Sequence, residues 1–136
     1  MKLVADANVL LSTVLGGRAR LILIHPGIQQ ILTTEHTFAE VEEYALVLGE
    51  KKRLRPDLLL LAVAALPVNV IARYGYSKSL PEAARRIGHR DPDDTELLAL
   101  ALSTGIPIWS NDRDFQSSGV EVFTTEALLR HLRIIR

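Results

Sequence analysis

The sequence has no cysteine, few aromatic residues and no excess of charge of either sign. The absence of cysteine excludes disulfides, thiolate metal sites and cysteine nucleophiles. Because 16 Lys and Arg balance 16 Asp and Glu, the chain is not a general basic binder of nucleic acid. No apolar run reaches the ~18 residues that span a bilayer, and Asp6 and Asn8 interrupt the apolar N-terminus. We therefore expect no export signal, no membrane span and a cytoplasmic location.

The sequence is rich instead in apolar residues, which make up 48% of its 136 positions. That content is enough to bury the core of one domain. A charged fraction of 24% is ordinary for a folded chain and argues against disorder. We expect residues 1–136 to form a single domain.

Short apolar runs alternate with segments of helical period. The strand candidates are residues 3–5, 31–32, 68–71, 106–109 and 120–123. The helical candidates are residues 8–15, 18–25, 34–48, 56–66, 81–87, 92–103 and 125–134. This alternation, with short connections, predicts an α/β fold in which helices cover a parallel sheet. Residues 74–79 are predicted to form an exposed loop.

Acidic residues follow two of the predicted strands and open one of the predicted helices. Asp6 ends the first strand, Asp112 and Asp114 follow the strand that ends at Trp109, and Asp94 begins a helix. In parallel sheets, binding sites form beyond the carboxyl ends of the strands. Carboxylates that meet there repel one another unless a cation neutralises them. Oxygen ligands favour Mg²⁺ or Mn²⁺, and a pair of such ions supports phosphodiester hydrolysis.

Each of these acids also has a simpler interpretation. Asp6 is equally well placed to cap a helix or form a turn, and Asp91 before Pro92 is a more natural helix cap than a ligand. Glu40 lies off the predicted buried stripe of its helix, so periodicity does not select it. The four histidines are not spaced four residues apart from one another, which makes a zinc site improbable.

Two basic clusters, residues 51–55 and Arg85 with Arg86 and Arg90, have two interpretations. Basic residues complement the dipole at a helix C-terminus, so the clusters fit solvated helix ends. They also fit a local phosphate track beside an acidic centre, which a neutral chain would need in order to hold nucleic acid.

Four segments, taken in order, resemble the PIN domain family, small nucleases that include the VapC-type toxins. Residues 3–11 resemble the family's opening strand-Asp-x-Asn motif, and residues 34–40 resemble its second acid segment. Residues 94–102 resemble its third acid helix, and residues 108–115 its closing strand-Ser-x-Asp-x-x-Phe motif. The resemblance implies metal-holding acids at Asp6, Glu40, Asp94 and Asp112, with Asp114 in or near the same shell and Asn8 and Ser110 orienting them. Residues 91–94 contain more acidic residues than this segment of the VapC-type toxins usually does, which leaves Asp91 as an additional candidate ligand.

The resemblance implies a three-layer α/β/α fold with a four- or five-stranded parallel sheet. It also implies Mg²⁺- or Mn²⁺-dependent cleavage of RNA, frequently single-stranded, by a homodimer. An antitoxin protein is a candidate partner.

Two other functions are alternatives to a nuclease. One is a catalytically inactive PIN-like interaction module, whose acids only cap helices and form turns. The other is a phosphoacceptor receiver domain. A receiver is disfavoured because the first strand ends in a single Asp and no lysine follows the strand at residues 120–123.

Overall fold

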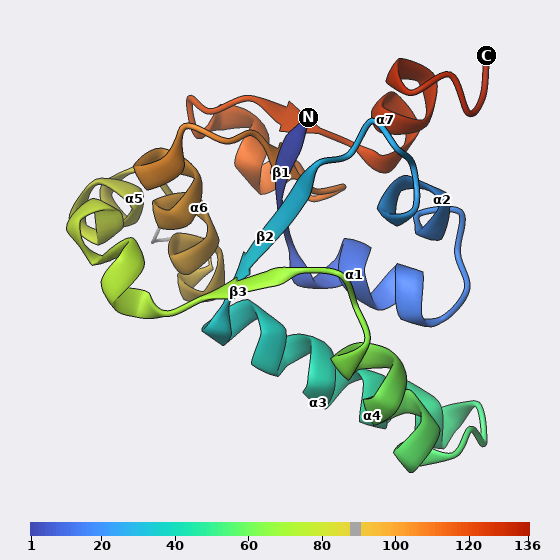
Figure 1. Ribbon diagram of the computed structural model, residues 1–136. Coiled ribbons are helices and arrows are strands. Elements are labelled where there is room, and N and C mark those ends of the chain that lie inside the picture. Colours follow the sequence, from blue (N-terminus) through green and yellow to red (C-terminus); the bar gives the residue numbers. More distant parts are fainter. Residues whose placement is uncertain (88–90) are drawn as a thin grey trace.

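The computed structural model describes residues 1–87 and 91–136, so Arg90 of the second basic cluster and His89 lie outside the described residues. All strands pair in parallel in one sheet of order β3-β2-β1-β4-β5 (Figure 1). The strands are β1 (Lys2–Ala5), β2 (Gln30–Thr34), β3 (Asn69–Ile71), β4 (Ile108–Trp109) and β5 (Val122–Phe123). The predicted α/β fold with a parallel sheet is confirmed.

Helices fill most of the connections between these strands. The α-helices of the described residues are α1 (Ala7–Val14), α2 (Arg20–Leu23), α3 (Glu35–Lys51), α4 (Pro56–Ala64), α5 (Leu80–Ile87), α6 (Pro92–Thr104) and α7 (Thr125–His131). The short 3₁₀ turns are η1 (Arg73–Gly75), η2 (Ser77–Ser79) and η3 (Arg113–Ser117).

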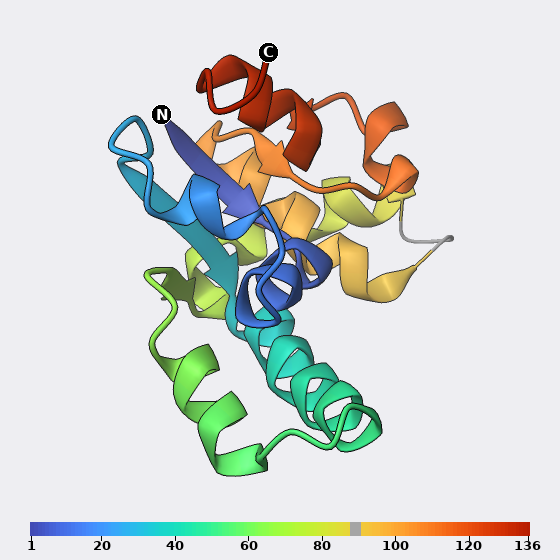
Figure 2. The same ribbon diagram turned by 90° about the vertical axis from the view of Figure 1, so that its right-hand side faces the viewer.

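The two faces of the sheet bury separate hydrophobic cores. In β1, Leu3 and Ala5 point into one core and Val4 into the other, because successive side chains of a strand alternate between faces. The Leu3 side packs against α1 to α4 and α7, and the Val4 side packs against α5 and α6. Figures 1 and 2 show α5 and α6 on the opposite side of the sheet from α1 and α3. The result is three layers.

Local sequence signals fix where the helices that matter for the site begin. The Thr34 hydroxyl caps α3 by accepting a hydrogen bond from the Thr37 N–H at 2.9 Å. Asp91 caps α6 and Pro92 occupies its first turn. Further along α3, Gly49 lets α4 approach closely, since a Cβ there would lie 2.1 Å from the Leu59 Cδ1.

The structure corrects two sequence predictions. Residues 74–79 are mostly exposed, as expected, but they form the 3₁₀ turns η1 and η2, and the side chain of Tyr76 is buried against the α6 core. The sequence did not predict the burial of Tyr76, because the residues that follow it, Ser77 to Ser79, are polar. The helix predicted over residues 18–25 is shorter, since Pro26 follows His25 and disfavours helical backbone before it.

Within residues 1–87 and 91–136, none of the helices has both the length and the apolar character needed to cross a membrane.

The burial of α6 gives a test of the packing. Leu98 is fully buried in the core on the Val4 face, whereas Ile24, directly after α2, is 74% exposed. We predict that Leu98→Ala lowers the free energy of unfolding by about 2–5 kcal/mol, while Ile24→Ala changes it by less than about 0.5 kcal/mol. Chemical denaturation of both variants checks this, and equal losses would contradict the assigned core.

Candidate metal centre

An acidic pocket lies beyond the carboxyl ends of β1, β2 and β4, with a volume of about 130 Å³. Because the strands are parallel, the segments that follow them meet at this edge of the sheet. The carboxylates that line the pocket are Asp6, Glu40, Asp91, Asp93, Asp94 and Asp112. Asn8 and Tyr44 also line it. The predicted convergence of Asp6, Glu40, Asp94 and Asp112 on one pocket is therefore observed.

Asp6 is held in place through both carboxylate oxygens. It is the N-cap of α1, and its Oδ1 accepts a hydrogen bond from the Val9 N–H at 3.0 Å. The Ser110 hydroxyl donates to Oδ2 and accepts a hydrogen bond from the Asp112 N–H at 2.9 Å. Ser110 thus links the end of β1 to the turn after β4, and its hydroxyl contacts the carboxylate of Asp6 and the backbone N–H of Asp112.

Asp94, Asp112 and Asp114 form the first of two ligand clusters, with oxygen atoms within 4.8 Å of one another. Asp112 is the N-cap of η3, where its Oδ1 accepts a hydrogen bond from the Asp114 N–H at 2.9 Å. In the described part of the chain, the Asp94 Oδ2 is buried and has no hydrogen-bond partner. A buried carboxylate oxygen without a donor is costly, so this atom marks a place for a cation or a proton.

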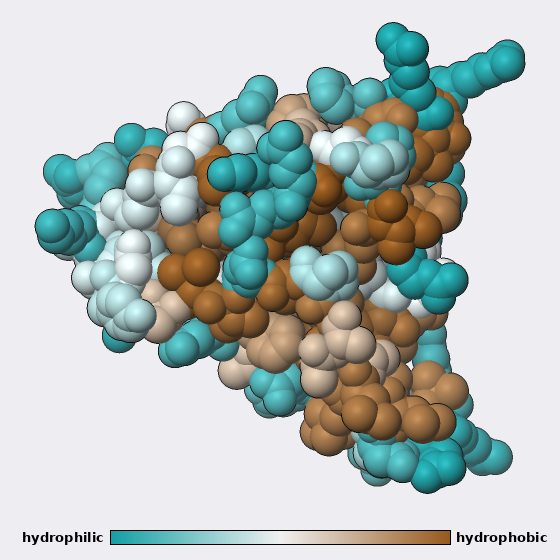
Figure 3. Space-filling view, viewed as in Figure 1, coloured by the Kyte–Doolittle hydropathy of each residue, from teal (hydrophilic) through white to brown (hydrophobic). Residues whose placement is uncertain are grey.

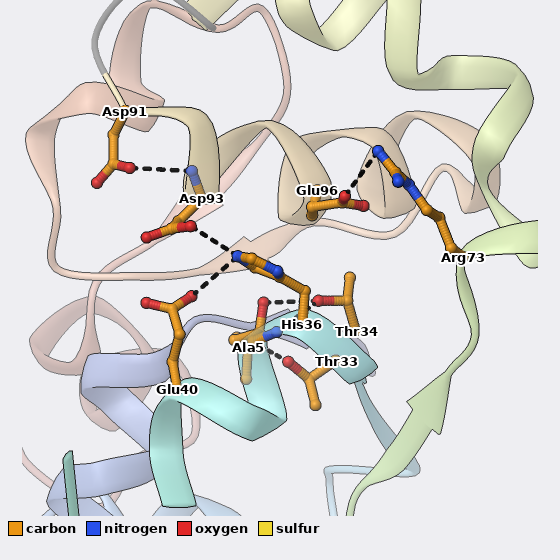
Figure 4. Close-up of polar contacts among 10 residues, drawn as sticks. Ala5, Thr33, Thr34, His36, Glu40, Arg73, Asp91, Asp93 and Glu96 are labelled. Carbon is orange, nitrogen blue, oxygen red and sulfur yellow. Dashed lines mark hydrogen bonds and ion pairs between the residues drawn. The ribbon is translucent and has the colours of Figure 1, made fainter. Parts of the chain in front are cut away.

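His36, Glu40 and Asp93 form the second cluster, also within 4.8 Å (Figure 4). The His36 Nε2 lies 2.6 Å from the Asp93 Oδ1 and 3.9 Å from the Glu40 Oε1. His36 was not predicted as a site residue, because the histidines of the sequence show no metal-ligand spacing among themselves, whereas Asp93 belongs to the acidic segment at residues 91–94. The spacing of His36 and Glu40, four residues apart on α3, was the available signal.

Burial and mutual repulsion disfavour ionisation in this pocket. Burial raises the pKa of Asp94 to about 7, and the charges of Asp91 and Asp112 act in the same direction. Burial likewise raises the pKa of Glu40 to about 7, with Asp93 adding to the effect and His36 opposing it.

The pKa of Asp6 is also raised. Burial is the largest cause, and the hydrogen bonds from Ser110 and from the Val9 N–H oppose it. A cation bound in the pocket would favour the loss of protons from Asp6, Glu40 and Asp94.

Not every candidate residue has the same place in the pocket. Asp91 caps α6, with its Oδ1 accepting a hydrogen bond from the Asp93 N–H at 2.9 Å, as the sequence favours. Asp6 lines the pocket but belongs to neither of the two ligand clusters of the described residues. Asp114 joins the cluster around Asp94.

The donor set fits a hard divalent cation. It is almost entirely carboxylate oxygen, the ligand type that Mg²⁺ and Mn²⁺ prefer. The Asp94 Oδ2 without a partner is the structural observation that agrees with this fit. Such a site can bind a phosphate group only when cations offset its negative charge.

Comparisons with known proteins give a matching family model and solved structures with a similar fold. The PIN domain model matches residues 4–133. PAE2754 from Pyrobaculum aerophilum aligns with a TM-score of 0.74 at 15% identity, over 99% of this chain and 91% of that one. DNA-bound VapBC from Salmonella typhimurium aligns with a TM-score of 0.69 at 18% identity, over 92% of this chain and 98% of that one.

VapC20 from Mycobacterium tuberculosis, described as a Sarcin–Ricin loop cleaving toxin, aligns with a TM-score of 0.58 at 18% identity, over 87% of this chain and 95% of that one. A comparison with curated proteins gives no match. Identities this low show a shared fold, whereas the family model covers nearly the whole sequence. The chain belongs to the PIN domain family.

Proposed function

We propose that this protein is a Mg²⁺- or Mn²⁺-dependent endoribonuclease that hydrolyses phosphodiester bonds of single-stranded RNA. The observation that carries the proposal is the acidic pocket, in which the buried Asp94 Oδ2 has no partner among the described residues. A cluster of carboxylates with raised pKa values raises the free energy of the folded state, and structures retain such strain mainly at functional sites.

In this proposal, Asp94 and Asp112 hold the metal together with Asp6 and Glu40. Asp114 completes the ligand group around Asp94, which its place in the same cluster supports. A bound divalent cation supplies water activation and neutralises the charge that develops on the phosphate oxygens.

The chain's own residues prepare that site by orienting its carboxylates. Ser110 fixes the Asp6 carboxylate through the hydroxyl hydrogen bond, and Asn8 faces the pocket from the first turn of α1. His36 bridges α3 and α6 by contacting both Glu40 and Asp93. Partners of this kind set the orientation and basicity of ligands.

The family relation supports RNA as the substrate. VapC20, which shares the fold, is described as a toxin that cleaves the Sarcin–Ricin loop. We further propose that residues 1–136 act as one nuclease domain in the cytoplasm. A toxin role, with an antitoxin protein as partner, is proposed from the VapBC complexes among the structural relatives.

An inactive PIN-like interaction module is the second candidate, and one observation favours it. Asp6, Asp91 and Asp112 all cap helices, so each has a structural role without a metal. Capping does not account for Glu40 or for the buried oxygen of Asp94. Metal binding and RNA cleavage therefore separate the two candidates.

We also propose a homodimer that forms through α4. Most helices on the surface of a soluble protein have a polar outer face. In α4, Leu59 and Val63 pack inward, yet Leu58 and Leu61 are 55% and 65% exposed. Figure 3 shows the resulting hydrophobic surface at the lower right, over α4. Apolar surface of this kind marks an interaction site.

The raised pKa of Asp94 predicts how stability depends on pH without metal. The unfolded chain ionises this group near pH ~4, whereas the folded chain keeps the proton until about pH 7. The free energy of unfolding therefore falls as pH rises between these values and then levels off. At pH 8 in EDTA, we expect Asp94→Asn to be more stable than the wild type by about 1–2 kcal/mol.

The same samples report on metal binding. Mn²⁺ at pH 8 is expected to raise the midpoint of thermal unfolding of the wild type by about 3 °C or more, and to leave Asp94→Asn unchanged. Glu50→Gln, an exposed acid at the far end of α3, serves as the control and should behave like the wild type. A wild type that ignores Mn²⁺ would contradict the metal site.

Cleavage of a labelled single-stranded RNA tests the reaction. We predict that Asp6→Asn and Asp94→Asn each lower kcat by about 100-fold or more, and that Ser110→Ala lowers it by about 10- to 100-fold. Glu50→Gln, purified in the same way, should cut like the wild type. Equal cleavage by all of these proteins would identify a contaminating nuclease, and no cleavage by any would favour the inactive module.

Light scattering tests the dimer. We predict that the wild type has twice the chain mass of 15.1 kDa, and that Leu58→Glu combined with Leu61→Glu has the mass of one chain and an unchanged circular dichroism spectrum. Charges on the exposed face oppose its burial without disturbing the core. A monomeric wild type, or a variant that stays dimeric, would rule out this interface.

A further inference from the structure

A basic residue, Arg73, follows β3 at the same edge of the sheet as the acidic pocket. Arg73 begins η1, two residues after β3 ends, just as Asp6 and Asp112 follow β1 and β4. Arg73 lines a groove of about 460 Å³ that also includes His36 and Asp93. Since Asp93 lines the acidic pocket as well, the groove and the pocket adjoin. A strand of nucleic acid leaving the pocket on this side would meet Arg73.

A buried acid fixes the position of Arg73. The Arg73 Nη2 lies 3.2 Å from the Glu96 Oε1, with 68% of the arginine side chain exposed but only 12% of the glutamate side chain (Figure 4). Glu96 stands one turn beyond Asp93 on α6, about 4.5 Å along the helix axis. Because Arg has five N–H donors in a planar fork, one contact with Glu96 leaves others for a ligand.

This ion pair is poorly explained by stability alone. Burying a carboxylate costs free energy that a partly exposed arginine only partly restores. Glu96 also contacts the buried Tyr76 hydroxyl, and burial together with this contact raises the pKa of Tyr76. Within the described residues, the Glu96 Oε2 is nevertheless buried without a hydrogen-bond partner. The ion pair keeps the Arg73 guanidinium in a set place beside the groove.

The described residues of the two basic clusters are less well placed to contact a strand in the pocket. Residues 51–55 lie at and beyond the far end of α3, where Lys51 is about 16 Å along the helix from Glu40. Arg85 and Arg86 both bind Glu82, and Arg86 also donates to the Ser118 carbonyl at 2.7 Å. Arg73 is therefore better placed for a phosphate than residues 51–55, Arg85 or Arg86.

The next residue of η1 is an aromatic with no packing role. Tyr74 is 88% exposed, more than any other large hydrophobic residue of the described chain, and it lines the next groove along η1, together with Leu102 and Ser103 near the end of α6. Proteins that bind single-stranded nucleic acid combine cations that hold phosphates with exposed aromatic rings that stack on bases.

We propose that η1 is a binding subsite for the RNA strand beside the acidic pocket. Arg73 binds a phosphate near the scissile one, Tyr74 stacks on a base further along the strand, in the next groove, and Glu96 is a positioning residue that holds the guanidinium. The proposal rests on the proposed ribonuclease function, because the acidic pocket defines where the scissile phosphate lies. Both contacts are independent of base identity, so the subsite adds affinity and not sequence preference.

Binding of a labelled 12-nucleotide single-stranded RNA, followed by fluorescence anisotropy with all acids of the pocket intact, tests the subsite without turnover when Ca²⁺, which also takes oxygen ligands, replaces Mg²⁺. We expect Arg73→Ala to weaken binding about 10-fold and to reduce the slope of log K against log salt by about 0.7, the value for one phosphate contact in a single strand. Tyr74→Ala should weaken binding about 10-fold with an unchanged slope.

A matched control and a reversed charge effect make the test specific. Arg130→Ala removes another exposed arginine that is paired with a glutamate, Glu126 on α7, and should leave affinity and slope unchanged. Glu96→Gln removes a negative charge, which by charge alone would tighten RNA binding. A positioning role predicts weaker binding instead, so tighter binding would overturn that role.

Cleavage by the active enzyme separates this proposal from the ribonuclease proposal. Arg73→Ala in the wild-type background should raise KM about 10-fold and change kcat by less than about 3-fold, the pattern of lost ground-state binding. If the wild type cleaves RNA but Arg73→Ala and Arg130→Ala bind RNA equally, the subsite fails and the ribonuclease stands. If Arg73→Ala loses affinity and salt slope but the wild type never cleaves, the subsite stands and the ribonuclease fails.

Discussion

Repulsion among carboxylates at one edge of a parallel sheet is the constraint on which the rest of this structure depends. The fold brings Asp6 and Asp112 to that edge because each follows a strand that ends there, and it brings Asp94 there because α6 begins at the same edge. Burial excludes the water that would stabilise and screen these charges, and for this reason the pKa of Asp94 is raised to about 7. Capping accounts for Asp6 and Asp112, but it does not account for the buried Asp94 oxygen, which has no hydrogen-bond partner among the described residues.

The hydrogen bonds that begin the helices also build the pocket. Asp6 and Asp112 accept backbone N–H groups of α1 and η3, and Asp91 does the same for α6. Helix N-termini carry partial positive charge, so these contacts offset part of the repulsion. They also fix the carboxylates before any ligand arrives. The capping interpretation and the proposed metal site, which look like alternatives in the sequence, are therefore compatible, because one carboxylate oxygen can accept the N–H group while the other faces the pocket.

Much of this arrangement was predictable from sequence, and the exceptions share a cause. Strand and helix periodicity predicted the parallel sheet, and strand ends pointed to Asp6 and Asp112, because those signals are local. Glu40 was predicted as a site residue only from the family resemblance, because the helical periodicity of its segment does not distinguish it from its neighbours. His36 and Arg73 were missed because their roles depend on side chains that reach across to α6. Contacts between distant elements leave no period in a sequence.

A crystal of the wild-type protein grown with Mn²⁺ at pH 8, with anomalous diffraction recorded at the manganese edge, tests the central claim most directly. We predict an anomalous peak in the acidic pocket, with an oxygen of Asp94 and one of Asp112 bound to the ion. A pocket without a peak, in which the Asp94 carboxyl is protonated or paired with a basic side chain, would contradict the account.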